Sequence, residues 1–205
     1  MPRASRAVFI NVPFDRRYRK LFDALVFAVH HCGLIARCAR EVDDGAQVRV
    51  DKLYTLVRDC RFGIHDLSRT TLDGRYRLPR FNMPLELGIF LGARRYGGRS
   101  QSRKVCLILD RDPYRYQVFC SDIAGQDIRA HHNDVGVAIA IVRDWIRTMH
   151  PLAVVVPGVH VIRQRYFRFQ KQLPRICGVA SLDARNLTFV DYRTLVTGWL
   201  SENPV

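Results

Sequence analysis

Short apolar runs alternate with amphipathic segments along most of this chain, and this alternation limits the folds open to it. The apolar runs cover residues 7–12, 34–39, 62–67 and 105–109. The segments after the first three bear apolar residues three and four positions apart. A short apolar run is typical of a buried strand, and the second spacing is typical of a helix face. Repeated strand–helix units predict a parallel sheet with helices on both of its faces.

A fifth unit and a C-terminal tail complete the predicted organisation. A short strand over 127–130 precedes a helix whose apolar face runs from Ala138 to Met149. We therefore predict an α/β fold over residues 1–150, a flavodoxin-like, doubly wound parallel sheet of five strands. Residues 151–158 are predicted to be a linker within a second unit, 151–205. That unit combines a basic aromatic segment, 161–173, with a final helix, and we expect a C-terminal helical appendage.

Composition and charge narrow the classes of partner and compartment. The chain carries 33 Lys+Arg against 19 Asp+Glu, a formal net charge of +14, which indicates anionic partners. The longest apolar stretches, 21–32 and 152–162, are too short to span a bilayer, so we expect no membrane partner. The first residues make a poor signal peptide, and a cytoplasmic address is expected.

Motifs for metals and cofactors are missing from the sequence. The six cysteines form no C-x-x-C pair, and the histidines at 30–31 and 131–132 are adjacent, so the two members of each pair point apart. We therefore expect no metal site. The sequence contains no P-loop motif, and no G-x-G-x-x-G motif follows the first strand. This argues against a nucleoside triphosphate bound by a P-loop and against a dinucleotide bound as in a Rossmann fold. A nucleotide is expected as a substrate instead.

Polar side chains follow the predicted strands, where an open parallel sheet binds its ligands. The candidates for substrate binding after the first, third and fourth strands are Asn11, Pro13, Phe14, Arg16, Arg17, Ser68 and Asp110. Phe14 suits stacking on a base, and Arg16 or Arg17 suits a phosphate. For each arginine alone, an exposed position in the first turn of a helix is an equally good explanation.

Glu86 is one of three glutamates in the chain and lies in a mainly apolar stretch, residues 83–91. Its place near the start of a predicted helix capped by Asn82 favours the anion, while apolar neighbours would raise the pKa of its carboxyl group. Such a conflict is typical of a catalytic acid, base or nucleophile. An ion pair with a nearby arginine, or a bond to backbone amides, would explain Glu86 as well.

Three segments carry a resemblance to a known family: VFINVPF at 8–14, IHDLS at 64–68 and FNMPLELGIFLGA at 81–93. Over roughly residues 7–130 the chain resembles the TIR-like and nucleoside 2-deoxyribosyltransferase-like superfamily of predicted nucleotide-binding proteins. In that family a glutamate in the "E-L-G" helix start attacks, or stabilises positive charge at, the anomeric carbon of a nucleoside or nicotinamide nucleotide. Glu86 matches this position. An aspartate usually precedes that glutamate, whereas here Arg80 and Asn82 occupy the stretch, which favours an anionic substrate.

These features predict an enzyme that cleaves or transfers at the N-glycosidic bond of a nucleotide, as an NAD glycohydrolase does. Breaking this bond builds positive charge on the ribose, which a carboxylate such as Glu86 stabilises or captures. Asp66 is predicted to hold the ribose hydroxyls or to transfer a proton, with help from Ser68. Asp66 could equally be a cap at a strand end, because Asp readily bonds nearby backbone amides.

Two other functions stay open at this stage. The same pocket could sense a nucleotide without turning it over. Alternatively, Arg163, Arg165, Arg168, Lys171 and Arg175, interleaved with aromatic residues, could bind nucleic acid, although a solvated basic helix face would look the same. The resemblance further implies self-association into a homo-oligomer and a role in bacterial defence, including antiphage defence.

Overall fold

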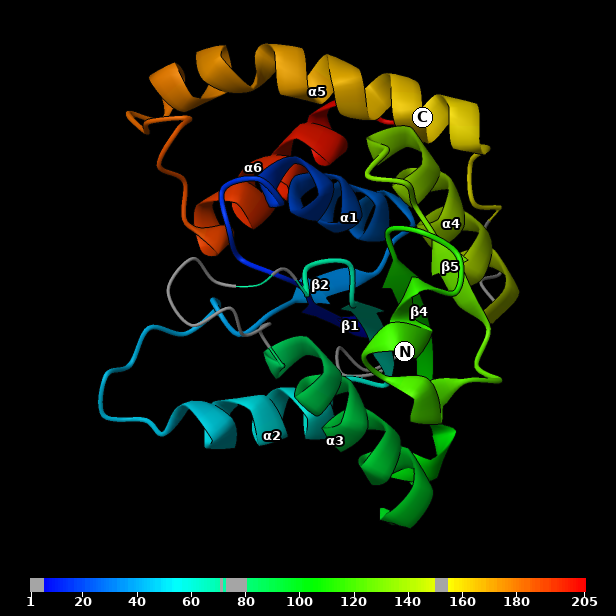
Figure 1. Cartoon of the computed structure of the whole chain (residues 1–205). Coiled ribbons are helices and arrows are strands. Elements are labelled where there is room, and N and C mark those ends of the chain that lie inside the picture. Colours follow the sequence, from blue (N-terminus) through cyan, green and yellow to red (C-terminus); the bar gives the residue numbers. More distant parts are fainter. Residues whose placement is uncertain (1–5, 71, 73–80, 150–154) are drawn as a thin grey trace.

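A five-stranded, all-parallel sheet forms the centre of the protein. The computed structural model describes residues 6–70, 72, 81–149 and 155–205. The strands β1 (Ala7–Asn11), β2 (Ile35–Arg37), β3 (Phe62–Asp66), β4 (Val105–Asp110) and β5 (Ile128–Ala130) lie in the order β2-β1-β3-β4-β5 (Figure 1). Every neighbouring pair is parallel. The predicted fold class, a flavodoxin-like α/β sheet with C-terminal helices, is confirmed.

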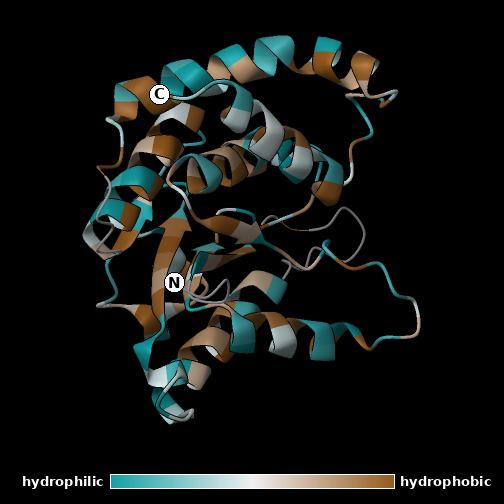
Figure 2. Ribbon diagram, turned by 180° about the vertical axis from the view of Figure 1, so that it is seen from behind, coloured by the Kyte–Doolittle hydropathy of each residue, from teal (hydrophilic) through white to brown (hydrophobic). Residues whose placement is uncertain are grey.

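Helices cover both faces of this sheet. On one face α1 (Arg19–His31) and α4 (Val135–Met149) pack in a large apolar cluster, and on the other α2 (Arg49–Asp59) and α3 (Asn82–Tyr96) pack against β1 (Figure 1). The strands β1 and β3 are buried along their whole length, as two-sided coverage requires. Figure 2 shows the apolar residues concentrated on the strands and on the inward sides of the helices.

The last two helices, α5 (Val159–Val179) and α6 (Phe189–Glu202), pack over α1 (Figure 1). The Phe27 ring of α1 lies 5.5 Å from the rings of Tyr166 and Phe169 and 6.0 Å from that of Trp199. Because α1 is covered on both sides, every residue from Leu21 to Val29 is buried. One apolar cluster therefore extends from β1 to α6. Residues 150–154, where the domain boundary is predicted, lie outside the described residues.

Local details differ from the predicted bounds. Strand β2 is shorter than the apolar run that predicts it, and β5 begins at Ile128. Asn82 is the first residue of α3 and Phe81 is its N-cap, so the predicted place of Asn82 as the cap is wrong. Asp15 accepts the backbone N–H groups of Arg17 and Tyr18, 2.9 and 3.0 Å away, and so closes the turn that precedes α1.

Three short 3-10 helices complete the described elements: η2 (Gln101–Arg103), η3 (Arg115–Val118) and η4 (Ser121–Ile123). Across the residues that the structure describes, no helix combines the length and the hydropathy needed to cross a bilayer.

Candidate functional site

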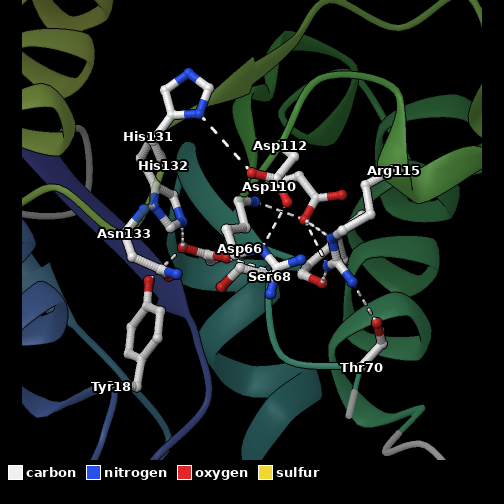
Figure 3. Close-up of polar contacts among 12 residues, drawn as sticks. Tyr18, Asp66, Ser68, Thr70, Asp110, Asp112, Arg115, His131, His132 and Asn133 are labelled. Carbon is white, nitrogen blue, oxygen red and sulfur yellow. Dashed lines mark hydrogen bonds and ion pairs between the residues drawn. The ribbon is translucent and has the colours of Figure 1, made fainter.

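The carboxyl ends of β3, β4 and β5 hold a buried set of polar side chains, which we call the carboxylate network (Figure 3). Its members are Tyr18, Asp66, Asp110, Arg115 and His131. Asp66, Asp110 and His131 are each 0% exposed. Strand pairing explains the proximity, because β3, β4 and β5 are neighbours whose ends meet at one edge of the sheet.

Asp66 is the centre of this network. The Tyr18 hydroxyl donates to its Oδ2, the Ser68 N–H donates to its Oδ1 at 2.8 Å, and His131 Nε2 lies 3.0 Å from Oδ2. Burial alone would raise the pKa of Asp66, but the contacts with His131, Tyr18 and Ser68 outweigh it and lower that pKa. Asp66 is therefore held as a carboxylate in the interior.

The tautomer of His131 follows from its second contact. The backbone N–H of Asn133 donates to His131 Nδ1 at 3.0 Å, so Nδ1 bears no hydrogen (Figure 3). In the neutral ring the proton must then lie on Nε2, the atom that faces Asp66.

Asp110 lies beside Asp66 in a different environment. Arg115 Nε donates to Asp110 Oδ1 at 2.9 Å, and the same guanidinium reaches the Thr70 hydroxyl at 2.9 Å and the Leu67 carbonyl at 2.7 Å. Burial raises the pKa of Asp110 in spite of Arg115. Among the described residues, Asp110 Oδ2 has no hydrogen-bond partner.

Asn11 joins the ends of β1 and β3, the point where the sheet changes its winding direction. Its amide nitrogen lies 3.1 Å from His65 Nδ1 and donates to the Met83 carbonyl in the first turn of α3 at 3.0 Å. Asn11 is 2% exposed, so it holds two strands and a helix together at this place. In open α/β sheets a ligand crevice forms at such a switch point.

Two clefts open beside this point. The inner cleft, about 450 Å³, is lined by Pro13, Phe14, Ala39, Arg40, Arg49, Asn82 and Met83. The outer cleft, about 1180 Å³, shares five of these residues and extends between the segments 41–52 and 183–192. The two clefts therefore adjoin, and Phe14 and Arg40 lie on the wall of both.

The sequence-predicted binding residues separate into two groups. Pro13, Phe14, Arg16 and Asn82 line one or both clefts. Asn11, Arg17, Ser68, Asp66, Glu86 and Asp110 line neither, and Arg80 lies outside the described residues. Their part in binding or catalysis stays a prediction.

The clefts contain arginines that have no carboxylate partner among the described residues. Arg40 places its guanidinium 4.6 Å from the centre of the Phe14 ring and donates to the Phe14 carbonyl at 3.0 Å. Arg49 forms no ion pair within the described chain, and Glu41, an acid of the outer cleft, is already paired with Arg37 at 2.6 Å. Positive charge beside an aromatic ring suits a ligand that bears a phosphate and a base.

Glu86 lies on the helix face that contributes to the inner cleft, because Asn82 and Met83 precede it by four and three residues in α3. It is partly buried, and the described residues offer it no hydrogen bond or ion pair. Burial raises the pKa of Glu86 to about 7, although the charge of Arg49 acts in the opposite direction. Glu86 is therefore a carboxyl group that titrates near neutral pH and is coupled to a residue of the cleft wall.

The ends of the second and fifth strands supply residues that the sequence prediction missed. Arg40 follows β2, Arg49 is the first residue of the next helix, α2, and His131 follows β5. The signal was available, since the rule that ligands bind at strand ends applies to these strands too. Tyr18 and Arg115 carried no such signal, because their contacts depend on distant parts of the chain.

Comparisons with protein-family models, with curated proteins and with solved structures found no match for this chain. The family resemblance therefore stays a prediction that rests on the three quoted segments. Among the described residues, no group of three histidines, cysteines or acids is arranged to hold a metal ion.

Proposed function

We propose that the protein cleaves or transfers at the N-glycosidic bond of a nucleotide, NAD or a related compound among them, with Glu86 at the anomeric carbon. The observation that carries the proposal is the position of Glu86. A carboxyl group with a pKa of about 7 and no described partner shares a helix face with two residues of the inner cleft. A structural ion pair would instead lower its pKa.

The reaction assigns a role to Glu86 and to three residues of the inner cleft, Phe14, Arg40 and Arg49. The bond between the ribose C1′ and the base nitrogen breaks, and the bonding electrons leave with the base. The Glu86 carboxylate stabilises the positive charge left at C1′ or forms an ester with it. Water or a second nucleobase then attacks C1′ and displaces Glu86 from any ester, and the proton of the attacking group passes to the departed base or to solvent. Arg40 and Arg49 hold the phosphate, and Phe14 supports the base.

The carboxylate network lies at the same edge of the sheet as the clefts. It fixes the ends of β3, β4 and β5, and Asn11 fixes the start of α3, on which Glu86 lies. A residue that binds substrate must contact it, whereas Asp66 is 0% exposed and contacts Tyr18, Ser68 and His131. The proton-transfer role of Asp66 stays a prediction, as do self-association and a role in bacterial defence.

The test compares the wild type with Glu86→Gln and with Glu202→Gln. The control makes the same chemical change at an exposed glutamate near the end of α6. Each protein is incubated with NAD, NADP and a panel of nucleosides and nucleotides, and free base is followed by chromatography. We expect release by the wild type and by Glu202→Gln, and loss of at least about a hundredfold in Glu86→Gln.

The other outcomes discriminate between functions. Equal release by Glu86→Gln and the wild type would remove Glu86 from the chemistry. No release, combined with thermal stabilisation by a nucleotide, would favour a sensing module over an enzyme.

A further inference from the structure

The C-terminal end of α3 carries a dense group of exposed cations, which we call the α3-end patch. Its members are Arg94, Arg95, Arg99 and Arg103, together with Tyr96, whose side chain is among the most exposed aromatics at 88%. No aspartate or glutamate occurs between residues 87 and 109. The patch therefore has positive charge and an exposed aromatic ring within ten residues.

Local hydrogen bonds hold these residues at one end of the molecule. The backbone N–H groups of Gln101 and Ser102 both donate to the Gly98 carbonyl, at 2.8 and 3.1 Å, so η2 turns back beside α3. The Gln101 side chain donates to the Arg58 carbonyl of α2 at 3.1 Å. In Figure 1 the end of α3 lies at the lower edge, away from α5. The patch precedes β4, so it lies towards the amino ends of the strands, opposite the clefts.

Ordinary structural roles explain only part of this charge. Arg94 and Arg95 lie in the last turn of α3, where a cation stabilises the helix dipole. That effect fades beyond the last turn, so it does not account for Arg99 and Arg103. Within the described chain, none of the four arginines forms an ion pair. Lys104 provides the contrast, because it is 2% exposed and donates to the Cys60 carbonyl at 2.5 Å.

Part of the basic segment of α5, which the sequence suggested for nucleic acid, is engaged in contacts within the protein, whereas Arg168, Lys171, Arg175 and Phe167 are exposed. Arg163 donates to the Gly136 carbonyl at 2.8 Å, and Arg165 donates to the Pro204 carbonyl at 3.1 Å. The aromatic rings of Tyr166 and Phe169 are buried in the core. The α5 segment thus offers fewer free cations and less stacking surface than its sequence suggests.

We propose that the α3-end patch binds single-stranded nucleic acid. Proteins that bind such strands combine a positively charged surface, which follows the phosphates, with aromatic side chains on which bases stack. Arg94, Arg95, Arg99 and Arg103 supply the charge, and Tyr96 supplies the ring. This inference is independent of the proposed glycosidic reaction, because the patch and the clefts share no residue.

The test measures binding of a labelled single-stranded oligonucleotide by fluorescence anisotropy at 50 and 200 mM salt. One variant replaces Arg94, Arg99 and Arg103 with Gln. The matched control replaces three exposed cations of α5, Arg168, Lys171 and Arg175, with Gln. We expect the patch variant to bind at least about tenfold more weakly at low salt, with a salt slope smaller by about 2, and the control to stay within about twofold of the wild type.

Tyr96 tests the stacking component. Tyr96→Ala should weaken binding by about fivefold or more, and Tyr96→Phe should retain it. The proposal is overturned if the wild type does not bind at 50 mM salt, if both triple variants lose affinity equally, or if Tyr96→Ala binds as the wild type does. Tighter binding to vesicles containing phosphatidylserine than to the oligonucleotide would also overturn it. Circular dichroism confirms that each variant is folded.

Discussion

Replacing Tyr18 with Phe removes one hydrogen bond from the centre of the carboxylate network. The Tyr18 ring is 2% exposed and its hydroxyl donates to Asp66, which is itself 0% exposed. Burial, followed by the charge of Asp66, raises the pKa of Tyr18, so the hydroxyl keeps its proton and remains a donor. The variant therefore leaves a buried carboxylate with one partner fewer.

The chain contains a matched control in Tyr166→Phe. Tyr166 is 4% exposed, and its hydroxyl donates to a neutral acceptor, the Lys20 carbonyl, at 3.3 Å. A hydrogen bond to a charged group contributes about 1.5–3 kcal/mol to stability, and a neutral one about 0.5–1.5 kcal/mol. We expect Tyr18→Phe to lower the free energy of unfolding by about 2–3 kcal/mol and Tyr166→Phe to lower it by about 1 kcal/mol.

Urea unfolding at pH 7 measures the two losses, and repetition between pH 5 and pH 3 tests their cause. The pKa of Asp66 is lowered in the folded state, so ionised Asp66 stabilises the fold above its unfolded pKa, about 3.9. That contribution is lost as the pH falls through the folded-state pKa. The stability gap between the wild type and Tyr18→Phe should thus narrow below about pH 4. Equal losses in the two variants, or a gap independent of pH, would refute the reasoning.

Two further predictions concern α3 and its surroundings. Gly63→Ala would place a methyl group 2.6 Å from a His65 nitrogen, and we expect it to lower the free energy of unfolding by about 1–3 kcal/mol, measured by thermal unfolding. Gly88→Ala is the control, because the space around Gly88 is open, and it should not lower the free energy of unfolding. If the reaction needs ionised Glu86, base release should rise with pH through about 7, and Arg49→Gln should move the midpoint upward because Arg49 lowers the pKa of Glu86. Arg40→Gln is the control and should not move it; an unmoved midpoint in Arg49→Gln would contradict the coupling.

The fold was predictable because its signals are local. Apolar runs such as residues 7–12 and 62–67 describe strands buried on both sides, and the segments between them have helical spacing. Errors occur at element ends, where Asn82 enters the helix and β2 loses residues at both ends of its apolar run. Single hydrogen bonds determine where a helix or strand begins and ends, and the local sequence does not predict these bonds well.

The candidate site was predictable in part. Glu86 could be recognised because a carboxyl group in an apolar stretch is conspicuous in any fold. Phe14 could be recognised from its place after a strand. Asp66 and Asp110 also stand at or near strand ends, yet they are buried and line neither cleft. Sequence position alone could not distinguish them from Phe14, because the difference lies in the residues that surround each side chain.

The sequence by itself determined the strand–helix alternation, the parallel sheet and the positive charge, since each depends on residue types and their spacing. Only the tertiary structure decided which polar residues face solvent. His131 reaches Asp66 across 65 positions because β3, β4 and β5 lie side by side, and α6 encloses Phe27 from the far end of the chain. Burial and pairing of this kind depend on contacts between distant segments, and they determine whether an aspartate supports the fold or an arginine is free for a ligand.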